Sequence, residues 1–167
     1  MIVKGAILLV AVVCALPTGG VLAGCYDRTA NGSQHRFVLD GGEALDTRTG
    51  LTWKRCSLGR GWDGRQCAGE TAFDTLDQAV EAAAAAGAGW RVPSGPELES
   101  IVDPSCGRPV VDESVFPDIS ADEEGTAKYW TTNEVGLANL VYYFDFMTGQ
   151  ADGHSRGFRL AVRLVRG

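Results

Sequence analysis

Five cysteines are the residues of this sequence whose side chains and spacing are most informative about chemistry. One of them, Cys14, lies in an apolar N-terminal run, and the other four follow it: Cys25, Cys56, Cys67 and Cys106. In an oxidising compartment four thiols form two disulfides, and three pairings are possible. The segment from Cys56 to Gly69 is rich in Gly and Arg, with a cysteine close to each end. This composition predicts a loop closed by a local bridge.

The N-terminal segment indicates that the protein reaches such a compartment. Lys4 is followed by an apolar run from Gly5 to Pro17 and then by Val21-Leu22-Ala23-Gly24-Cys25, which is the pattern of a bacterial export signal. The run is shorter than the roughly 20 residues that a membrane-spanning helix needs. Cleavage after Ala23 would remove residues 1–23 and release a soluble periplasmic or secreted chain.

An alternative cleavage would produce a lipoprotein. Leu22-Ala23-Gly24-Cys25 also fits a lipobox, in which residues 1–24 are removed and Cys25 is lipidated. The protein would then be a membrane-anchored lipoprotein of the cell envelope with a mainly structural role. Lipidation would leave three thiols, one of them without a partner, so the even number of cysteines after the signal favours a disulfide at Cys25.

Catalytic chemistry has little support in the sequence. The two histidines, His35 and His154, are far apart, and no nucleophile motif such as G-x-S-x-G is present. They do not combine with the cysteines into a zinc site at ligand spacing. We therefore predict no catalytic residue, no cofactor and ordinary surface or turn positions for both histidines. An enzyme with an unrecognised site is a second alternative.

An acidic segment is the other candidate for ligand chemistry. Oxygen ligands close together in sequence can hold Ca²⁺, and they occur at Asp118, Asp122, Glu123 and Glu124. No EF-hand spacing is present, which favours a solvated loop over a calcium site. The chain has 15 basic and 21 acidic residues, a net charge of −6, and no basic cluster. Nucleic acid is therefore not an expected partner.

Short strands must position these groups. Abundant glycine predicts many turns, and strands are expected at residues 35–39, 44–46, 51–54, 129–132 and 140–147. A turn is expected at Gly149–Gly153. Beyond it, apolar residues alternate with others as in a half-buried strand: Phe158, Leu160, Val162 and Leu164 alternate with Arg159, Ala161 and Arg163.

Two helices are expected in the middle of the chain. Thr75 with Gln78, and Ser94 with Glu97, have the spacing of capping boxes. The expected buried positions are Leu76, Ala79, Val80 and Ala83 in the first helix and Leu98, Ile101 and Val102 in the second. A loop with Phe116-Pro117 as a packing anchor follows. The order of strands, two helices and strands predicts a single α+β domain over residues 35–167, after a short lead-in at 24–34.

Several short motifs, taken in order, carry a resemblance to a known family. They are Asp46-x-x-Thr49-Gly50-Leu51-Thr52-Trp53, Trp90-Arg91-Val92-Pro93 ahead of Glu97-Leu98, Phe116-Pro117, Tyr129-Trp130-Thr131-Thr132, and Val162 to Gly167. From Arg36 to Gly167 the chain resembles the Lcl C-terminal domain family, which is named for the terminal domain of a bacterial collagen-like adhesin. The resemblance implies a fold like that of C-type lectins and the formylglycine-generating enzyme, with two helices packed on small, twisted antiparallel sheets.

The resemblance also bears on the cysteines and the ligand. It implies the pairs Cys56–Cys67 and Cys25–Cys106. The formylglycine-generating relatives use a reactive cysteine pair late in the chain, whereas no cysteine follows Cys106 here, so that activity is not expected. The adhesin's ligand would be a sulfated polysaccharide. We do not expect it here, because this sequence is acidic and has no collagen-like stalk.

The resemblance further suggests roles for particular side chains. In the Trp90-Arg91-Val92-Pro93 string, Trp90 is expected in the core and Arg91 is expected to hold a carboxylate or loop carbonyls, ahead of Glu97. In lectin-like folds the C-terminal β region carries the binding surface, which here would comprise Trp130, Thr131, Thr132, Asn133, Tyr142, Tyr143 and Arg156. The competing interpretation is that these aromatic residues only fill the sheet core.

The sequence therefore predicts an exported, disulfide-stabilised, non-catalytic binding module of the bacterial cell envelope. Its expected partner is an extracytoplasmic carbohydrate or protein. A membrane is expected as a partner only if Cys25 is lipidated.

Overall fold

The computed structural model describes Cys25, residues 36–136 and residues 139–167. The predicted export signal, His35 and the lead-in apart from Cys25 lie outside the described residues. Within the described part, the chain is an α+β domain with small antiparallel sheets and two α-helices, as predicted. In that part, no helix is long and apolar enough to cross a membrane.

The first sheet joins the start of the domain to its end. Its order is β1-β2-β3-β9, and its strands are β1 (Phe37–Asp40), β2 (Glu43–Asp46), β3 (Thr52–Lys54) and β9 (Val165–Arg166). The Asp46 motif has a local role in this sheet. The Asp46 carboxylate accepts hydrogen bonds from the Arg48 backbone N–H and the Thr49 hydroxyl, both at 3.0 Å. These bonds close the turn that directs Trp53 into the core, where it is fully buried.

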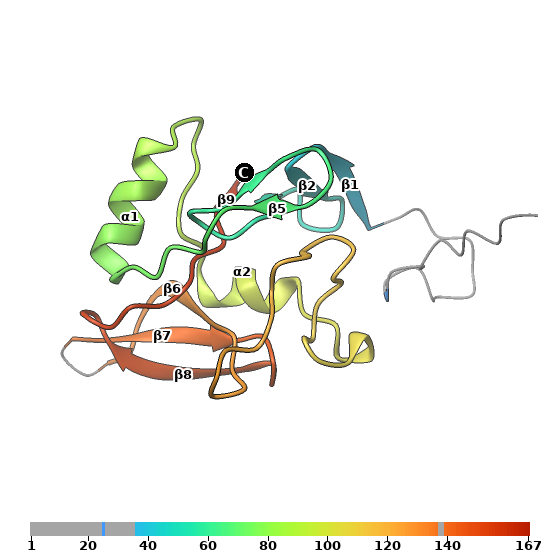
Figure 1. Ribbon diagram of the computed structural model, residues 1–167. Helices are drawn as coiled ribbons and strands as arrows, with labels where there is room; N and C mark the ends of the chain where they lie inside the picture. Colours follow the sequence, from blue (N-terminus) through green and yellow to red (C-terminus); the bar gives the residue numbers. More distant parts are fainter. Residues whose placement is uncertain (1–24, 26–35, 137–138) are drawn as a thin grey trace, which may run out of the picture.

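A second sheet forms the lower layer in Figure 1. Its order is β6-β7-β8, and its strands are β6 (Lys128–Glu134), β7 (Leu140–Asp145) and β8 (Gln150–Ser155). The predicted turn at Gly149–Gly153 is wrong, because the turn precedes Gln150 and residues 150–155 pair with β7 along its whole length. Since β8 is an edge strand with little buried surface, its sequence is polar and gives no hydrophobic pattern.

Both helices begin where the sequence predicts. Thr75 caps α1 (Leu76–Ala85) and Ser94 caps α2 (Gly95–Ser100), each in a complete capping box. Helix α1 buries Leu76, Ala79 and Ala83, but Val80 is 46% exposed, so its predicted burial is wrong. The buried stripe is narrow because small alanines suffice to pack α1. Helix α2 packs on β6 and β7, as Figure 1 shows.

The predicted half-buried strand at residues 158–164 is also wrong. The segment makes single bridges instead: Leu160 to Asp74, Ala161 to Tyr129 and Val165 to Arg91. It runs between the two sheets and is enclosed on both sides, so residues from Leu160 to Val165 are all buried, including Arg163. Phe158, expected to be buried, is 47% exposed because it precedes the enclosed part.

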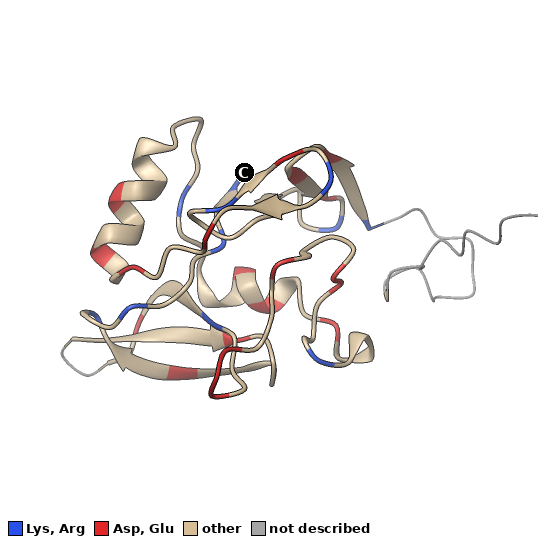
Figure 2. Ribbon diagram, viewed as in Figure 1, with Lys and Arg blue, Asp and Glu red and all other residues tan. Residues whose placement is uncertain are grey.

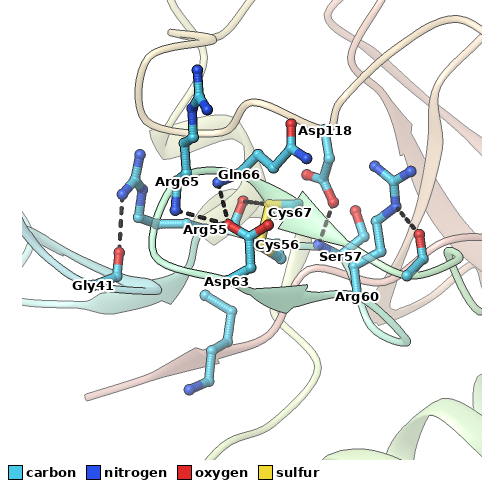
Figure 3. Close-up of a disulfide and its surroundings, with 12 residues drawn as sticks. Gly41, Arg55, Cys56, Ser57, Arg60, Asp63, Arg65, Gln66, Cys67 and Asp118 are labelled. Carbon is cyan, nitrogen blue, oxygen red and sulfur yellow. Dashed lines mark hydrogen bonds between the residues drawn. A yellow bond between two sulfur atoms is a disulfide. The ribbon is translucent and has the colours of Figure 1, made fainter.

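Two disulfides anchor the loops. The structure joins Cys25 to Cys106, with the Cα atoms 5.0 Å apart, and Cys56 to Cys67, with the Cα atoms 5.5 Å apart. These are the pairs that the resemblance implied, and both separations suit a disulfide. The Cys56–Cys67 bridge closes a small hairpin made of β4 (Gly61–Trp62) and β5 (Cys67–Ala68). Figure 3 shows this loop, in which the Asp63 carboxylate accepts from the backbone N–H groups of Arg65 and Gln66.

Two clusters of buried side chains form the core. One lies around Trp53, Phe116 and Phe146, and includes Leu98 and Ile101 of α2, so the packing anchor predicted at Phe116 is confirmed. The other lies around Trp90 and Trp130 and takes the buried face of α1. The sheet β6-β7-β8 contributes to both clusters, which places its two faces against different packing partners.

Candidate functional site

The predicted ligand surface separates into buried and exposed parts. Trp130 and Thr131 are fully buried. The Trp130 indole N–H donates to the Asp74 carbonyl at 2.8 Å, and the Thr131 hydroxyl donates to the Tyr142 carbonyl at 2.7 Å. Their polar groups are satisfied inside the protein, so neither side chain can meet a ligand. For these two residues the interpretation as sheet core is the correct one.

Tyr143 and Arg156 are both held by contacts within the protein. Tyr143 is partly buried against the core cluster that contains Trp130. Arg156 donates to Asp77 of α1 at 2.8 Å and to Glu134 of β6 at 3.2 Å, and the hydrogen bond to Asp77 raises the pKa of the guanidinium. Arg156 therefore links α1 to the sheet across the protein surface rather than presenting a free cation.

Two of the predicted residues, Asn133 and Tyr142, line a surface depression, which we call the Tyr142 hollow. Its volume is about 340 Å³. Tyr142 is 39% exposed and lies two residues from the buried Phe144 on β7, so both rings point to the same face of the sheet. The full lining is Gly95, Pro96, Glu99, Asn133, Glu134, Tyr142, Phe144, Gly149 and Ala151. Thr132, although exposed, does not line it.

Hydrogen-bonding groups surround the Tyr142 ring. The Asn133 side-chain carbonyl accepts from the Gly95 backbone N–H at 2.6 Å, which fixes the amide and leaves its NH₂ group for a ligand. The Glu99 carboxylate and the Tyr142 hydroxyl have no hydrogen bond or ion pair within the described part of the chain. An aromatic face, an amide and a carboxylate thus converge on one depression, which suits stacking and hydrogen bonding to a small polar ligand.

The Trp90-Arg91-Val92-Pro93 string lies outside the lining of this hollow but supports α2, which contributes Gly95, Pro96 and Glu99 to it. The Arg91 guanidinium donates two hydrogen bonds to the Glu97 carboxylate, at 2.8 and 2.5 Å. The same carboxylate accepts from the Ser94 backbone N–H at 2.7 Å. The hydrogen bonds from Arg91 lower the pKa of Glu97 from 4.5 to about 2. The Pro93 carbonyl accepts from the Thr132 backbone N–H at 2.9 Å. These contacts hold the first turn of α2 against β6.

Trp90 is buried, as expected, and is enclosed by cations. The Lys54 ammonium lies 4.2 Å and the Arg166 guanidinium 4.5 Å from the centre of its ring. Both cations also pair with Glu43, at 2.8 and 2.7 Å. Trp90 thus lies in the core, and Arg91 holds the Glu97 carboxylate.

A comparison with known families places the chain. The family model of the Lcl C-terminal domain matches residues 42–166. The chain belongs to the Lcl C-terminal domain family. The match begins six residues after the start of the resemblance inferred from the motifs and extends almost to the C-terminus. No curated protein matches the chain.

A buried polar centre supports the fold of this Lcl C-terminal domain. It comprises Ser57, Asp118, Tyr129 and Arg163, and none of its side chains is appreciably exposed. Arg163 donates to Asp118 at 2.6 Å and to the Ser57 hydroxyl at 3.1 Å. The Ser57 hydroxyl also lies 2.8 Å from the Tyr129 hydroxyl. The Ser57 backbone N–H donates to Asp118 at 2.7 Å, and Figure 3 shows this hydrogen bond.

The electrostatics of this centre are those of a structural ion pair. Burial alone would raise the pKa of Asp118, but the charge and hydrogen bond of Arg163 outweigh it, and the pKa is lowered. Burial raises the pKa of Tyr129. The sequence analysis missed this centre because the alternation around Arg163 indicated a half-buried strand, and no local signal pairs residue 163 with residue 118.

The acidic segment does not gather its carboxylates at one point. Asp118 points inward to Arg163, whereas Asp122 accepts from the Thr126 backbone N–H and hydroxyl, at 2.8 and 2.7 Å, and closes its own loop. Glu124 pairs with Lys128 at 3.0 Å, and Glu123 is exposed. Within the described residues no group of three or more His, Cys, Asp or Glu side chains could hold a metal ion.

His154 lies on β8, and its ring stacks on that of Phe158 with the centroids 3.7 Å apart. Phe158, expected to be buried, and Phe73, for which the sequence predicts nothing, are both exposed, and the residues that α2 contributes to the Tyr142 hollow were not predicted. Helical spacing explains the last case, because Pro96 and Glu99 lie three positions apart on the surface of α2.

Proposed function

We propose that this Lcl C-terminal domain is an exported, non-catalytic binding module that holds a carbohydrate in the Tyr142 hollow. The observation that carries the proposal is the exposed Tyr142 ring, which stands beside an amide and a carboxylate that the fold leaves available. Sugars present C–H faces to aromatic rings and hydroxyl groups to amides and carboxylates. The lining supplies both kinds of contact in one depression.

The disulfides support the proposed export. Two bridges in one small domain suit a compartment outside the cytoplasm, where they persist. Because the Cys25 sulfur bonds to Cys106, it has no free valence for a lipid thioether. The bridge therefore favours a soluble chain that begins at Gly24 over a lipoprotein anchored through Cys25.

The arrangement of the elements supports the proposed lectin-like relationship. Helix α2 packs on a small antiparallel sheet, and β9 pairs beside β3, which brings the end of the domain next to its first hairpin. In this setting the hollow lies in the C-terminal β region, where lectin-like folds carry their binding surface. Its lining offers hydrogen bonds and an aromatic face rather than a nucleophile beside a base, which favours binding over catalysis.

A panel of immobilised neutral oligosaccharides, built from glucose, galactose, mannose and N-acetylglucosamine, tests the proposal on the chain from Gly24 to Gly167. We expect one sugar class to bind, and we expect Tyr142→Ala to weaken that binding about tenfold or more, as loss of an aromatic anchor does. Glu99→Gln, which keeps the shape and removes the charge, is expected to weaken it less.

Phe73→Ala is the matched control, since it removes another exposed ring that lies outside the hollow. Sugar binding that Tyr142→Ala leaves unchanged would contradict the proposal, as would the absence of binding across the panel.

A further inference from the structure

A second concave surface, separate from the Tyr142 hollow, displays two phenylalanine rings. Phe73 is 56% exposed and Phe158 is 47% exposed. They line a groove of about 450 Å³ between the segment before α1, the acidic loop and the chain that follows β8. We call it the phenylalanine groove. No residue lines both this groove and the Tyr142 hollow.

The fold holds the two rings in place. Asp74, next to Phe73, exchanges two backbone hydrogen bonds with Leu160, each 3.1 Å long, so the two segments run side by side. The Arg159 guanidinium donates to the Phe73 carbonyl at 3.1 Å. The ring of Phe158 stacks on His154. Because these backbones are fixed before a partner arrives, little conformational entropy is lost on binding.

The groove is bordered by negative charge. Figure 2 shows acidic residues on the loop before β6, which lies below α2 in this view. Glu124 is neutralised by Lys128, and Arg159 lies 3.9 Å from Asp74. Within the described part of the chain, Asp122 and Glu123 form no ion pair within 4 Å, although the charge of Lys128 also acts on Asp122. The hydrogen bonds within its loop lower the pKa of Asp122 against the effect of desolvation, so it remains ionised at neutral pH.

These features distinguish between the possible occupants. A phenylalanine ring has no polar group, so a pair of such rings favours apolar side chains over the hydroxyl-rich surface of a sugar. Two unpaired carboxylates beside the rings attract cations and repel the anionic surface of a bacterial membrane. The complementary partner is therefore a protein segment that combines apolar and basic side chains.

We propose that the phenylalanine groove is a protein-docking site for an exposed segment in which an aliphatic or aromatic residue is flanked by Lys or Arg. The apolar residue packs between Phe73 and Phe158, and the basic residues face Asp122 and Glu123. This proposal does not depend on carbohydrate binding in the Tyr142 hollow. With two sites of different chemistry, the domain can bind a glycan and a protein at the same time.

Display of random heptapeptides against the chain from Gly24 to Gly167 tests this proposal. We expect enriched sequences with one apolar anchor flanked by Lys or Arg. A synthetic consensus peptide, measured by fluorescence anisotropy, is then expected to lose about tenfold in affinity with either Phe73→Ala or Phe158→Ala. Glu123→Lys is also expected to weaken binding of the peptide, because it reverses the charge at the rim of the groove. The loss relative to wild type should grow as the salt concentration is lowered, since salt screens the repulsion.

Val80→Ala is the matched control. Val80 is a comparably exposed apolar side chain on α1 outside the groove, and alanine preserves the helix. Thermal unfolding of each variant checks that the fold is intact. Enrichment of acidic or purely polar peptides would overturn the proposal. So would equal binding of the consensus peptide to the wild type and to the Phe73→Ala, Phe158→Ala double variant.

Discussion

The Tyr142 hollow and the phenylalanine groove both place exposed aromatic rings beside carboxylates, yet they suit different partners. In the hollow the ring carries a hydroxyl and stands next to the Asn133 amide. In the groove two rings without polar atoms stand next to a loop whose carboxylates outnumber the cations in the lining. The difference shows that exposure of an aromatic residue does not identify its ligand. The ligand is indicated instead by the polar groups that the fold fixes around the ring.

The two surfaces also differ in what supports them. The hollow lies on β6, β7 and the first turns of α2, and the contacts of Arg91 and Glu97 hold it. The groove lies on connecting segments, and its floor includes Asp118 and Tyr129 of the buried polar centre. Damage to each support should therefore affect one surface more than the other.

The largest effect is expected from the buried polar centre. Asp118→Ala leaves the fully buried Arg163 without its counter-ion, and loss of one partner of a buried pair costs about 3–5 kcal/mol. Urea denaturation should show this loss. At a temperature where the variant stays folded, peptide binding in the groove should fall while sugar binding in the hollow persists.

Asp77→Ala is the control for that variant, because it breaks the exposed ion pair with Arg156. Such pairs contribute up to about 1 kcal/mol. If Asp118→Ala lowered the free energy of unfolding no more than Asp77→Ala does, the buried ion pair would not stabilise the fold as we describe.

A smaller loss of stability is expected when the Cys56–Cys67 bridge is removed. These cysteines are 11 residues apart, and in the loop-entropy account a bridge of this span contributes about 3 kcal/mol. The Cys56→Ser, Cys67→Ser double variant should therefore unfold at lower urea concentration. Since the bridge touches neither surface, both binding affinities should be retained under native conditions. Loss of sugar binding would contradict the proposed independence of the hollow.

The smallest effect is expected at Glu97, in the first turn of α2 beside the hollow, and depends on pH. The pKa of Glu97 is lowered in the folded protein to about 2, from an ordinary value of 4.5. A lowered pKa means that its ion pair stabilises the fold fully above pH 4.5 and is lost as pH falls from 4.5 toward 2. Glu97→Gln keeps the capping-box acceptor but removes the charge that pairs with Arg91, and it should cost up to about 1 kcal/mol at pH 7.

Denaturant midpoints measured from pH 7 to pH 2.5 test this prediction. The difference between wild type and Glu97→Gln should shrink as the pH falls. A constant difference would show that the Glu97 charge does not contribute. Because Glu97 sits at the first turn of α2, sugar binding should weaken in this variant and peptide binding should not.

Features set by local signals could be predicted from the sequence. Turn residues and capping boxes depend on neighbours a few positions apart, so β1 to β3 and both helix starts were predicted closely. Strand β8 was missed because an edge strand needs no hydrophobic face. The burial of Arg163 was missed because it depends on Asp118, which is 45 residues away.

The candidate site was predictable in part for the same reason. The resemblance pointed to Asn133 and Tyr142, which the structure places in the lining of the hollow, but strand alternation alone could not show which aromatic rings face the core. Trp130 and Tyr142 lie on adjacent strands of one sheet, yet one is enclosed and the other is exposed. The contribution of Glu99 and Pro96 required the packing of α2 against that sheet.

The most direct test of the central claim is sugar binding by three forms of the chain from Gly24 to Gly167 on the same oligosaccharide panel: wild type, Tyr142→Ala and Phe73→Ala. The account predicts that wild type and Phe73→Ala bind the same sugar equally well and that Tyr142→Ala loses about tenfold or more in affinity. Sugar binding lost with Phe73→Ala and retained with Tyr142→Ala would contradict the assignment of the hollow and the groove.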